Sequence, residues 1–132
     1  KLRHLYTTGV IEISYPPYGC HVCILNNLQT ICGLHLFAGD EQVLATMPNL
    51  RKLKCRLLSN WFPELDFLIH LQTLNVSYEK DTNGRVRFPS PEKFPPNLKN
   101  LTLSGLFGLP WTETSTLGRL PNLEVLKLLD SD

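Results

Sequence analysis

One pattern dominates this sequence. Leu-x-x-Leu-x-Leu, or a close variant of it, occurs six times along the 132 residues. Successive copies start 26, 22, 21, 27 and 25 residues apart, so their spacing is nearly regular. Within a copy, apolar residues alternate at positions 4 and 6, which is the pattern of a short strand with one buried face. The copies begin at Leu2, Leu28, Leu50, Leu71, Leu98 and Leu123.

A period of 20–29 residues is that of leucine-rich repeats, in which a short strand and a return segment stack on the next repeat. The sequence therefore predicts an α/β protein, a leucine-rich-repeat solenoid shaped as a horseshoe arc. Parallel strands would line its concave face, with short helices, 3₁₀ turns and loops on the convex face. Apolar residues three apart predict such turns in Val43–Met47, Leu65–Leu68 and Leu117–Leu120, and a short helix over Thr112–Leu120 interrupted by Gly118.

The whole chain, 1–132, is expected to be one leucine-rich-repeat segment of about six repeats. The sequence begins within a copy of the pattern and ends just after a predicted strand. Terminal repeats of a solenoid normally carry polar caps, and neither end shows one. We therefore expect a fragment of a longer protein.

Positive charge gathers on the predicted concave face, although the net charge of the chain is only +1. Positions 2, 3, 5 and 7 of the six copies should point to this face or its rims. They hold seven of the thirteen lysines and arginines but only one of the twelve acids, Glu124. Together with His4, which adds positive charge when protonated, the predicted partner-binding residues are Arg3, His4, Arg51, Lys52, Lys54, Arg56, Lys99 and Lys127.

Four of these cations lie within six residues, from Arg51 to Arg56. An acidic protein surface would offset their repulsion and would also steer association. The alternative is a solvated face, since exposed strands often carry lysine to keep other chains away. Only Tyr6 is aromatic on this face, so a platform for stacking nucleic-acid bases is not expected.

The sequence offers no catalytic motif. It has no glycine-rich phosphate loop, nucleophile elbow or His-x-x-x-His pair, so we expect neither an enzyme, nor a cofactor, nor a metal in this segment. Cys20 and Cys23 form a single Cys-x-x-Cys without a second pair, and are interpreted as structural or incidental thiols. No uncharged apolar run is long enough to predict a membrane span. Trp61 and Trp111 are expected to pack over the convex edge of the core.

The amino-acid sequences of several copies resemble those of a known family. Leu50–Cys55, Phe94–Ser104 and Leu120–Leu128 resemble the repeats of plant intracellular disease-resistance proteins. Phe94–Asp130, with Leu-Pro-Trp-Thr at 109–112, resembles the solanaceous late-blight-resistance group of coiled-coil, nucleotide-binding, leucine-rich-repeat receptors. The resemblance covers nearly the whole chain and is most specific after Met47.

The resemblance implies a function. Such receptors carry a signalling domain, a central ATP/ADP-binding switch and a C-terminal repeat region, which recognises pathogen effectors or their host targets and holds the switch off. This chain would be that region: a non-catalytic recognition and autoinhibition module in innate immunity and the hypersensitive response. Its partners would be an effector, a host target or the receptor's own nucleotide-binding domain. ATP/ADP would bind only upstream. The protein would be cytoplasmic, with a nuclear or membrane-associated location of the full-length protein as the alternative.

One family feature is missing from the sequence. The asparagine expected at position 9 of each copy is absent, which argues against a regular asparagine ladder and uniform curvature. That position holds Val10, Leu36, Leu58, Glu79, Leu106 and Ser131.

Two alternatives are also compatible with the sequence. One is the substrate-binding region of an F-box-type ubiquitin-ligase receptor, which would need an F-box upstream. The other is the ectodomain of a cell-surface leucine-rich-repeat receptor, which would carry glycans on Asn75 or Asn100, the two matches to the glycosylation pattern.

Overall fold

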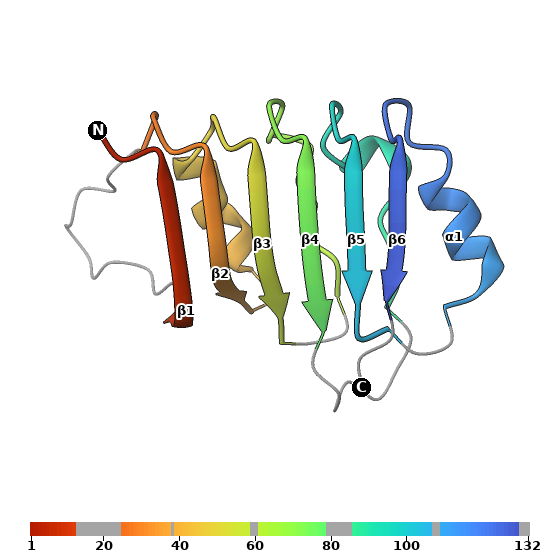
Figure 1. Cartoon of the computed structure of the whole chain (residues 1–132). Coiled ribbons are helices and arrows are strands. Elements are labelled where there is room, and N and C mark those ends of the chain that lie inside the picture. Colours follow the sequence, from red (N-terminus) through yellow and green to blue (C-terminus); the bar gives the residue numbers. More distant parts are fainter. Residues whose placement is uncertain (13–24, 38, 59–60, 79–85, 107–108, 130–132) are drawn as a thin grey trace.

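Six strands form one parallel sheet in which they follow each other in sequence order (Figure 1). The computed structural model describes residues 1–12, 25–37, 39–58, 61–78, 86–106 and 109–129. Each strand lies where the leucine pattern predicts one. Their bounds are β1 His4–Glu12, β2 Thr30–Leu36, β3 Lys52–Leu57, β4 Thr73–Tyr78, β5 Asn100–Ser104 and β6 Val125–Leu129.

The returns between strands carry three short helical elements within the described ranges: η1 Asp40–Thr46, η2 Pro91–Lys93 and α1 Trp111–Leu117. Leu44 of η1 and Leu117 of α1 belong to the same buried core as the strands. The short helix predicted over Thr112–Leu120 is confirmed as α1, which ends at Leu117, immediately before Gly118. The α/β class is confirmed as well, and the sheet is compatible with an arc of stacked repeats.

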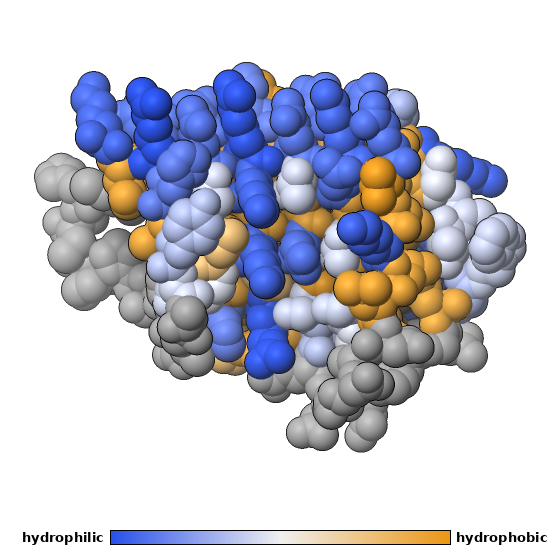
Figure 2. Space-filling model, viewed as in Figure 1, coloured by the Kyte–Doolittle hydropathy of each residue, from blue (hydrophilic) through white to orange (hydrophobic). Residues whose placement is uncertain are grey.

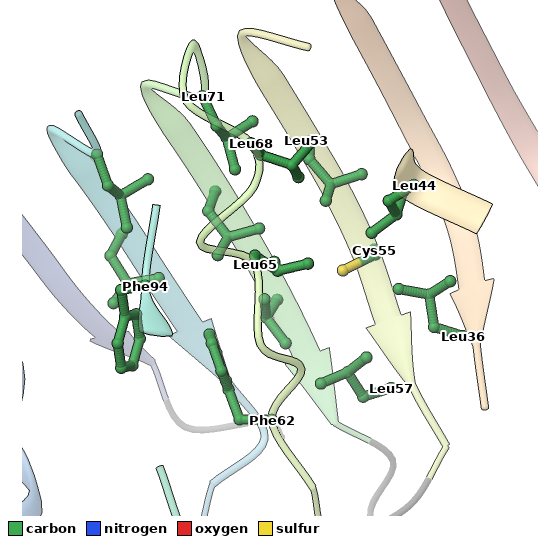
Figure 3. Close-up of a cluster of buried hydrophobic side chains, with 14 of the residues drawn as sticks. Leu36, Leu44, Leu53, Cys55, Leu57, Phe62, Leu65, Leu68, Leu71 and Phe94 are labelled. Atoms are coloured by element: carbon green, nitrogen blue, oxygen red, sulfur yellow. The ribbon is translucent and has the colours of Figure 1, made fainter. Parts of the chain in front are cut away.

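Rows of leucine run across the sheet because the parallel strands are in register. Leu53 of β3 lies opposite Leu74 of β4, which lies opposite Leu101 of β5. All three side chains are buried. In the return between β3 and β4, further leucines face the strands from the other side (Figure 3). These rows follow from the pattern itself, since side chains two apart on a strand share a face.

An aromatic cluster packs in the core between the return that precedes β4 and the return that follows it. The ring centroids of Phe62 and Phe94 lie 5.0 Å apart, and those of Phe62 and Phe88 lie 5.3 Å apart in an edge-on arrangement. Both spacings are typical of favourable aromatic pairs. Trp61 also packs against this core as predicted, whereas the prediction for Trp111 is wrong: this first residue of α1 is 79% exposed.

The register of β2 differs from the one that the pattern predicts. If every residue of β2 paired in turn with one residue of β3, Gly33 would occupy core position 6 and Leu34 would lie on the predicted concave face. In the structure the register shifts after Cys32, and Leu34, not Gly33, lies opposite Cys55. Gly33 forms a bulge with a φ of 95°, a left-handed conformation that favours glycine. Leu34 is buried as a result, and His35 takes the position beside Arg56.

An asparagine ladder does form, but before the strands rather than after them. The side-chain amide of Asn49 donates to the carbonyl of Asn26 at 2.6 Å, and that of Asn97 donates to the carbonyl of Ile69 at 2.6 Å. Asn122 donates in the same way to the carbonyl of Pro96, at 2.8 Å. Each donor asparagine immediately precedes the first leucine of a copy. The recurring tripeptide Pro-Asn-Leu is the sequence signal for this ladder.

His70 occupies the position in the ladder between Asn49 and Asn97. Its side chain forms no hydrogen bond to another described residue. Replacing His70 by asparagine should let its amide donate to the carbonyl of Pro48, as Asn122 does to Pro96. A net intramolecular hydrogen bond contributes about 1 kcal/mol, so urea denaturation should show His70→Asn to be more stable by roughly that amount. Asn97→His should lose a similar amount. No gain in the first variant would show that the loop before β4 does not share the geometry of the other loops.

Several predictions fall on residues outside the described ranges, namely the loop at 14–19, Cys20 and Cys23. Among the helices of the described residues, none is long and apolar enough to cross a membrane.

Candidate recognition surface

The exposed side of β3 carries a line of cations. Along this strand the residues alternate without interruption between exposed and buried, so Lys52, Lys54 and Arg56 point away from the core. Alternate residues of a strand lie about 6.6 Å apart. Arg51 immediately precedes the strand and is also exposed. These four residues, Arg51, Lys52, Lys54 and Arg56, are referred to below as the basic column.

Uncharged residues flank the basic column on both sides. Lys54 lies between Cys32 of β2 and Asn75 of β4. The next strand, β5, presents Asn100, Thr102 and Ser104 at the corresponding positions. Within the described part of the chain, no carboxylate forms an ion pair with the column. In Figure 2 the column is a hydrophilic stripe through the middle of the open face. Among the described residues, its charge is therefore not neutralised by the chain itself.

The other predicted site residues are exposed too, but among them only Arg3 lines a common cavity with a residue of the basic column, Arg51. The remaining four are Arg3, His4, Lys99 and Lys127, and each is exposed. The Nδ1 atom of His4 in β1 forms a hydrogen bond of 2.9 Å with the hydroxyl group of Thr30. Lys99 precedes β5 and Lys127 lies in β6, two and three strands away from β3. Sequence reasoning missed His35, because the bulge at Gly33 shifts it onto this face.

The open face becomes apolar at β6. Val125 is 39% exposed and Leu129 is 51% exposed, and they lie on either side of Lys127 along the strand. Figure 2 shows this region as a hydrophobic patch beside the polar middle of the sheet. The face thus combines a charged centre on β3 with an apolar margin at β6.

Two titratable groups are buried in the core, the thiol of Cys55 and the hydroxyl of Tyr78. Burial raises the pKa of the Cys55 thiol to about 12, so the thiol is protonated at neutral pH. The hydroxyl of Tyr78 donates to the carbonyl of Trp61 at 3.0 Å, and burial raises its pKa as well. Over the ranges that the structure covers, no group of three histidines, cysteines or acids could hold a metal ion.

Comparison with known proteins gives two distant relatives from Solanum demissum. The chain is 32% identical, over 98% of its length, to one protein of this species that is named as a late blight resistance protein homolog. It is 30% identical, over 97% of its length, to a second protein of the species that carries the same kind of name. Both relatives are thus named for resistance to late blight. No family model matches the chain.

The similarity to these late blight resistance homologs extends over nearly the whole chain, so it includes both the leucine rows and the open face. The chain spans only a small part of the relatives themselves, 10% of the first and 17% of the second.

Proposed function

We propose that this chain is a leucine-rich-repeat segment of a plant intracellular nucleotide-binding disease-resistance receptor, and that it recognises proteins without catalysis. The observation that carries the proposal is the basic column, which stands without ion pairs to the described residues on an open face between uncharged strands. The parallel sheet in sequence order and the similarity to two late blight resistance homologs support it. The resemblance of the repeats to this receptor group supports it further.

The mechanism is electrostatic docking of an acidic protein surface. Two unit charges about 6.6 Å apart repel by roughly 0.6 kcal/mol in water, and by about 2.5 kcal/mol at an effective dielectric constant of 20. A bound acidic surface turns this repulsion into attraction and accelerates encounter. Because the Debye length is about 8 Å at physiological ionic strength, added salt should weaken the contact.

Two acidic surfaces are proposed as partners: the switch domain of the same receptor, and a pathogen effector or its host target. Contact with the switch domain would hold the receptor inactive, and displacement of that contact would release defence signalling. ATP or ADP would bind in the upstream domain, with no nucleotide held by this segment. The compartment proposed for the whole receptor is the cytoplasm.

Reversing two charges of the column tests this proposal in the full-length receptor. Lys54→Glu/Arg56→Glu is chosen because these two residues lie within β3 and point away from the core. Binding of the segment to the switch domain or effector, measured by biolayer interferometry, should weaken about 10- to 100-fold, a loss that fits close charge pairs. In a leaf cell-death assay the receptor should then become autoactive or stop responding to its effector. The first result assigns the column to the switch domain and the second to recognition.

The matched control is Arg87→Glu/Arg119→Glu. It changes the net charge by the same amount at two exposed residues outside the strands. We expect binding and signalling close to wild type for this control. The proposal fails if the β3 variant binds and signals normally, or if the control is impaired to the same degree.

A further inference from the structure

A cavity of about 260 Å³ opens at the edge of the sheet where the strands begin. The residues around it precede four successive strands, β1 to β4, and every one of them is polar. They are Arg3, Asn26, Asn27, Gln29, Asn49, Arg51 and His70. No lining residue is acidic, and two carry a permanent positive charge. We propose that this cavity binds a phosphate group, either free phosphate or a small polar phosphate ester.

The backbone fixes the two arginines on opposite sides of one glutamine. The carbonyl of Arg3 accepts hydrogen bonds from the N–H groups of Gln29 at 2.7 Å and of Thr30 at 3.0 Å. The carbonyl of Gln29 in turn accepts from the N–H groups of Arg51 at 2.7 Å and of Lys52 at 3.0 Å. Adjacent strands lie about 4.8 Å apart, so the two arginine backbones are roughly 10 Å from each other. Both side chains can then reach one anion held above Gln29.

One further hydrogen bond fixes the side of the cavity that Asn26 and Asn49 line. The amide of Asn49 donates to the carbonyl of Asn26 at 2.6 Å, and this bond ties the loop before β3 to the loop before β2. The guanidinium groups of Arg3 and Arg51, the amide of Asn27 and the imidazole of His70 have no hydrogen-bond partner among the described residues. The cavity therefore presents several unused donors around a space that no carboxylate of its lining fills.

The donor arrangement favours phosphate over a carboxylate. A single guanidinium satisfies both oxygens of a carboxylate through a bidentate pair, so a second arginine would add little. A phosphate carries more oxygens in a tetrahedral arrangement and more negative charge, so it can accept from two guanidinium groups and from amides at once. The lining residues are all polar and most of the surface that they expose to the cavity is polar, which disfavours an apolar ligand.

The test uses the 132-residue chain and inorganic phosphate as the probe. Isothermal titration at constant ionic strength should show saturable binding of one phosphate per chain, with acetate binding at least tenfold more weakly. Arg3→Gln and Arg51→Gln should each weaken phosphate binding tenfold or more. Arg119→Gln is the matched control, an exposed arginine outside the cavity, and should bind phosphate like the wild type.

A second titration, with glycerol phosphate, distinguishes the two sources of the phosphate group. Tighter binding than for inorganic phosphate supports an ester ligand, and equal binding supports recognition of phosphate alone. The proposal is overturned if binding does not saturate, if acetate binds as tightly as phosphate, or if Arg119→Gln weakens binding as much as the cavity variants. Because no protein partner takes part, the result is independent of the docking test on Lys54 and Arg56.

Discussion

Replacing Leu74 by alanine is expected to lower the free energy of unfolding by about 3–4 kcal/mol, within the range measured for fully buried leucines in other proteins. Leu74 is 0% exposed and lies in the middle of the leucine row, between Leu53 and Leu101. Its removal would leave a cavity that both neighbouring strands border. Urea denaturation followed by circular dichroism measures the loss.

The matched control for this variant is Leu129→Ala, the same change on the open face of β6, where the side chain is 51% exposed. We expect this variant to change stability by no more than about 0.5–1 kcal/mol. Equal losses at the two positions would contradict the leucine rows as the source of stability.

Gly105→Ala is expected to destabilise the protein by at least about 3 kcal/mol, because two costs coincide there. The residue follows β5 with a φ of 80°, and an alanine in this region costs roughly 1–2 kcal/mol. In addition, a Cβ atom would lie 2.3 Å from the carbonyl oxygen of Tyr78, which belongs to the neighbouring strand and cannot rotate away. The backbone of β4 or β5 would have to shift.

Alanine variants at two other glycines distinguish the conformational cost from the steric cost. Gly39 has a φ of 95° but nothing within 4 Å of a built Cβ, so Gly39→Ala should cost only the conformational strain, about 1–2 kcal/mol. Gly118 has a φ of −66° and its nearest contact is 3.4 Å away, so alanine there should be neutral or stabilise slightly. Thermal denaturation should show the largest loss at Gly105, a smaller one at Gly39 and none at Gly118. Equal losses at Gly105 and Gly39 would contradict the close approach to Tyr78.

The strands and the basic column could be predicted because each depends on a single local rule. Alternation within β3 assigns Leu53 to the core and Lys54 to the open face without knowledge of any neighbour. The bulge at Gly33 could not be predicted in this way, since Leu34 is as apolar as a core residue but falls one position late. Its burial depends on how β2 aligns with β3, which the local pattern does not contain.

The leucine pattern and the family pattern predict neither the position of the asparagine ladder nor the cavity, for a related reason. The family pattern places its asparagine after each strand, whereas Asn49 and Asn97 make their hydrogen bonds before the strands. The cavity gathers residues from four separate stretches, and its shape depends on how the loops before the strands are placed side by side. The leucine pattern predicts Arg3 and Arg51 on the same face, but their position around a common space follows only from the folded backbone.

The sheet order described above also has a consequence for how the chain folds. Each strand pairs only with the strand before and after it in the sequence, so every pairing closes a short stretch of chain and none requires the two ends to meet. The copies that begin at Leu50 and Leu71 are the closest together, 21 residues apart, and β3 and β4 pair without a register shift. This pair is expected to form early and to template its neighbours in both directions. The basic column would then be assembled at the nucleus of folding, and fraying of β1 or β6 would leave it in place.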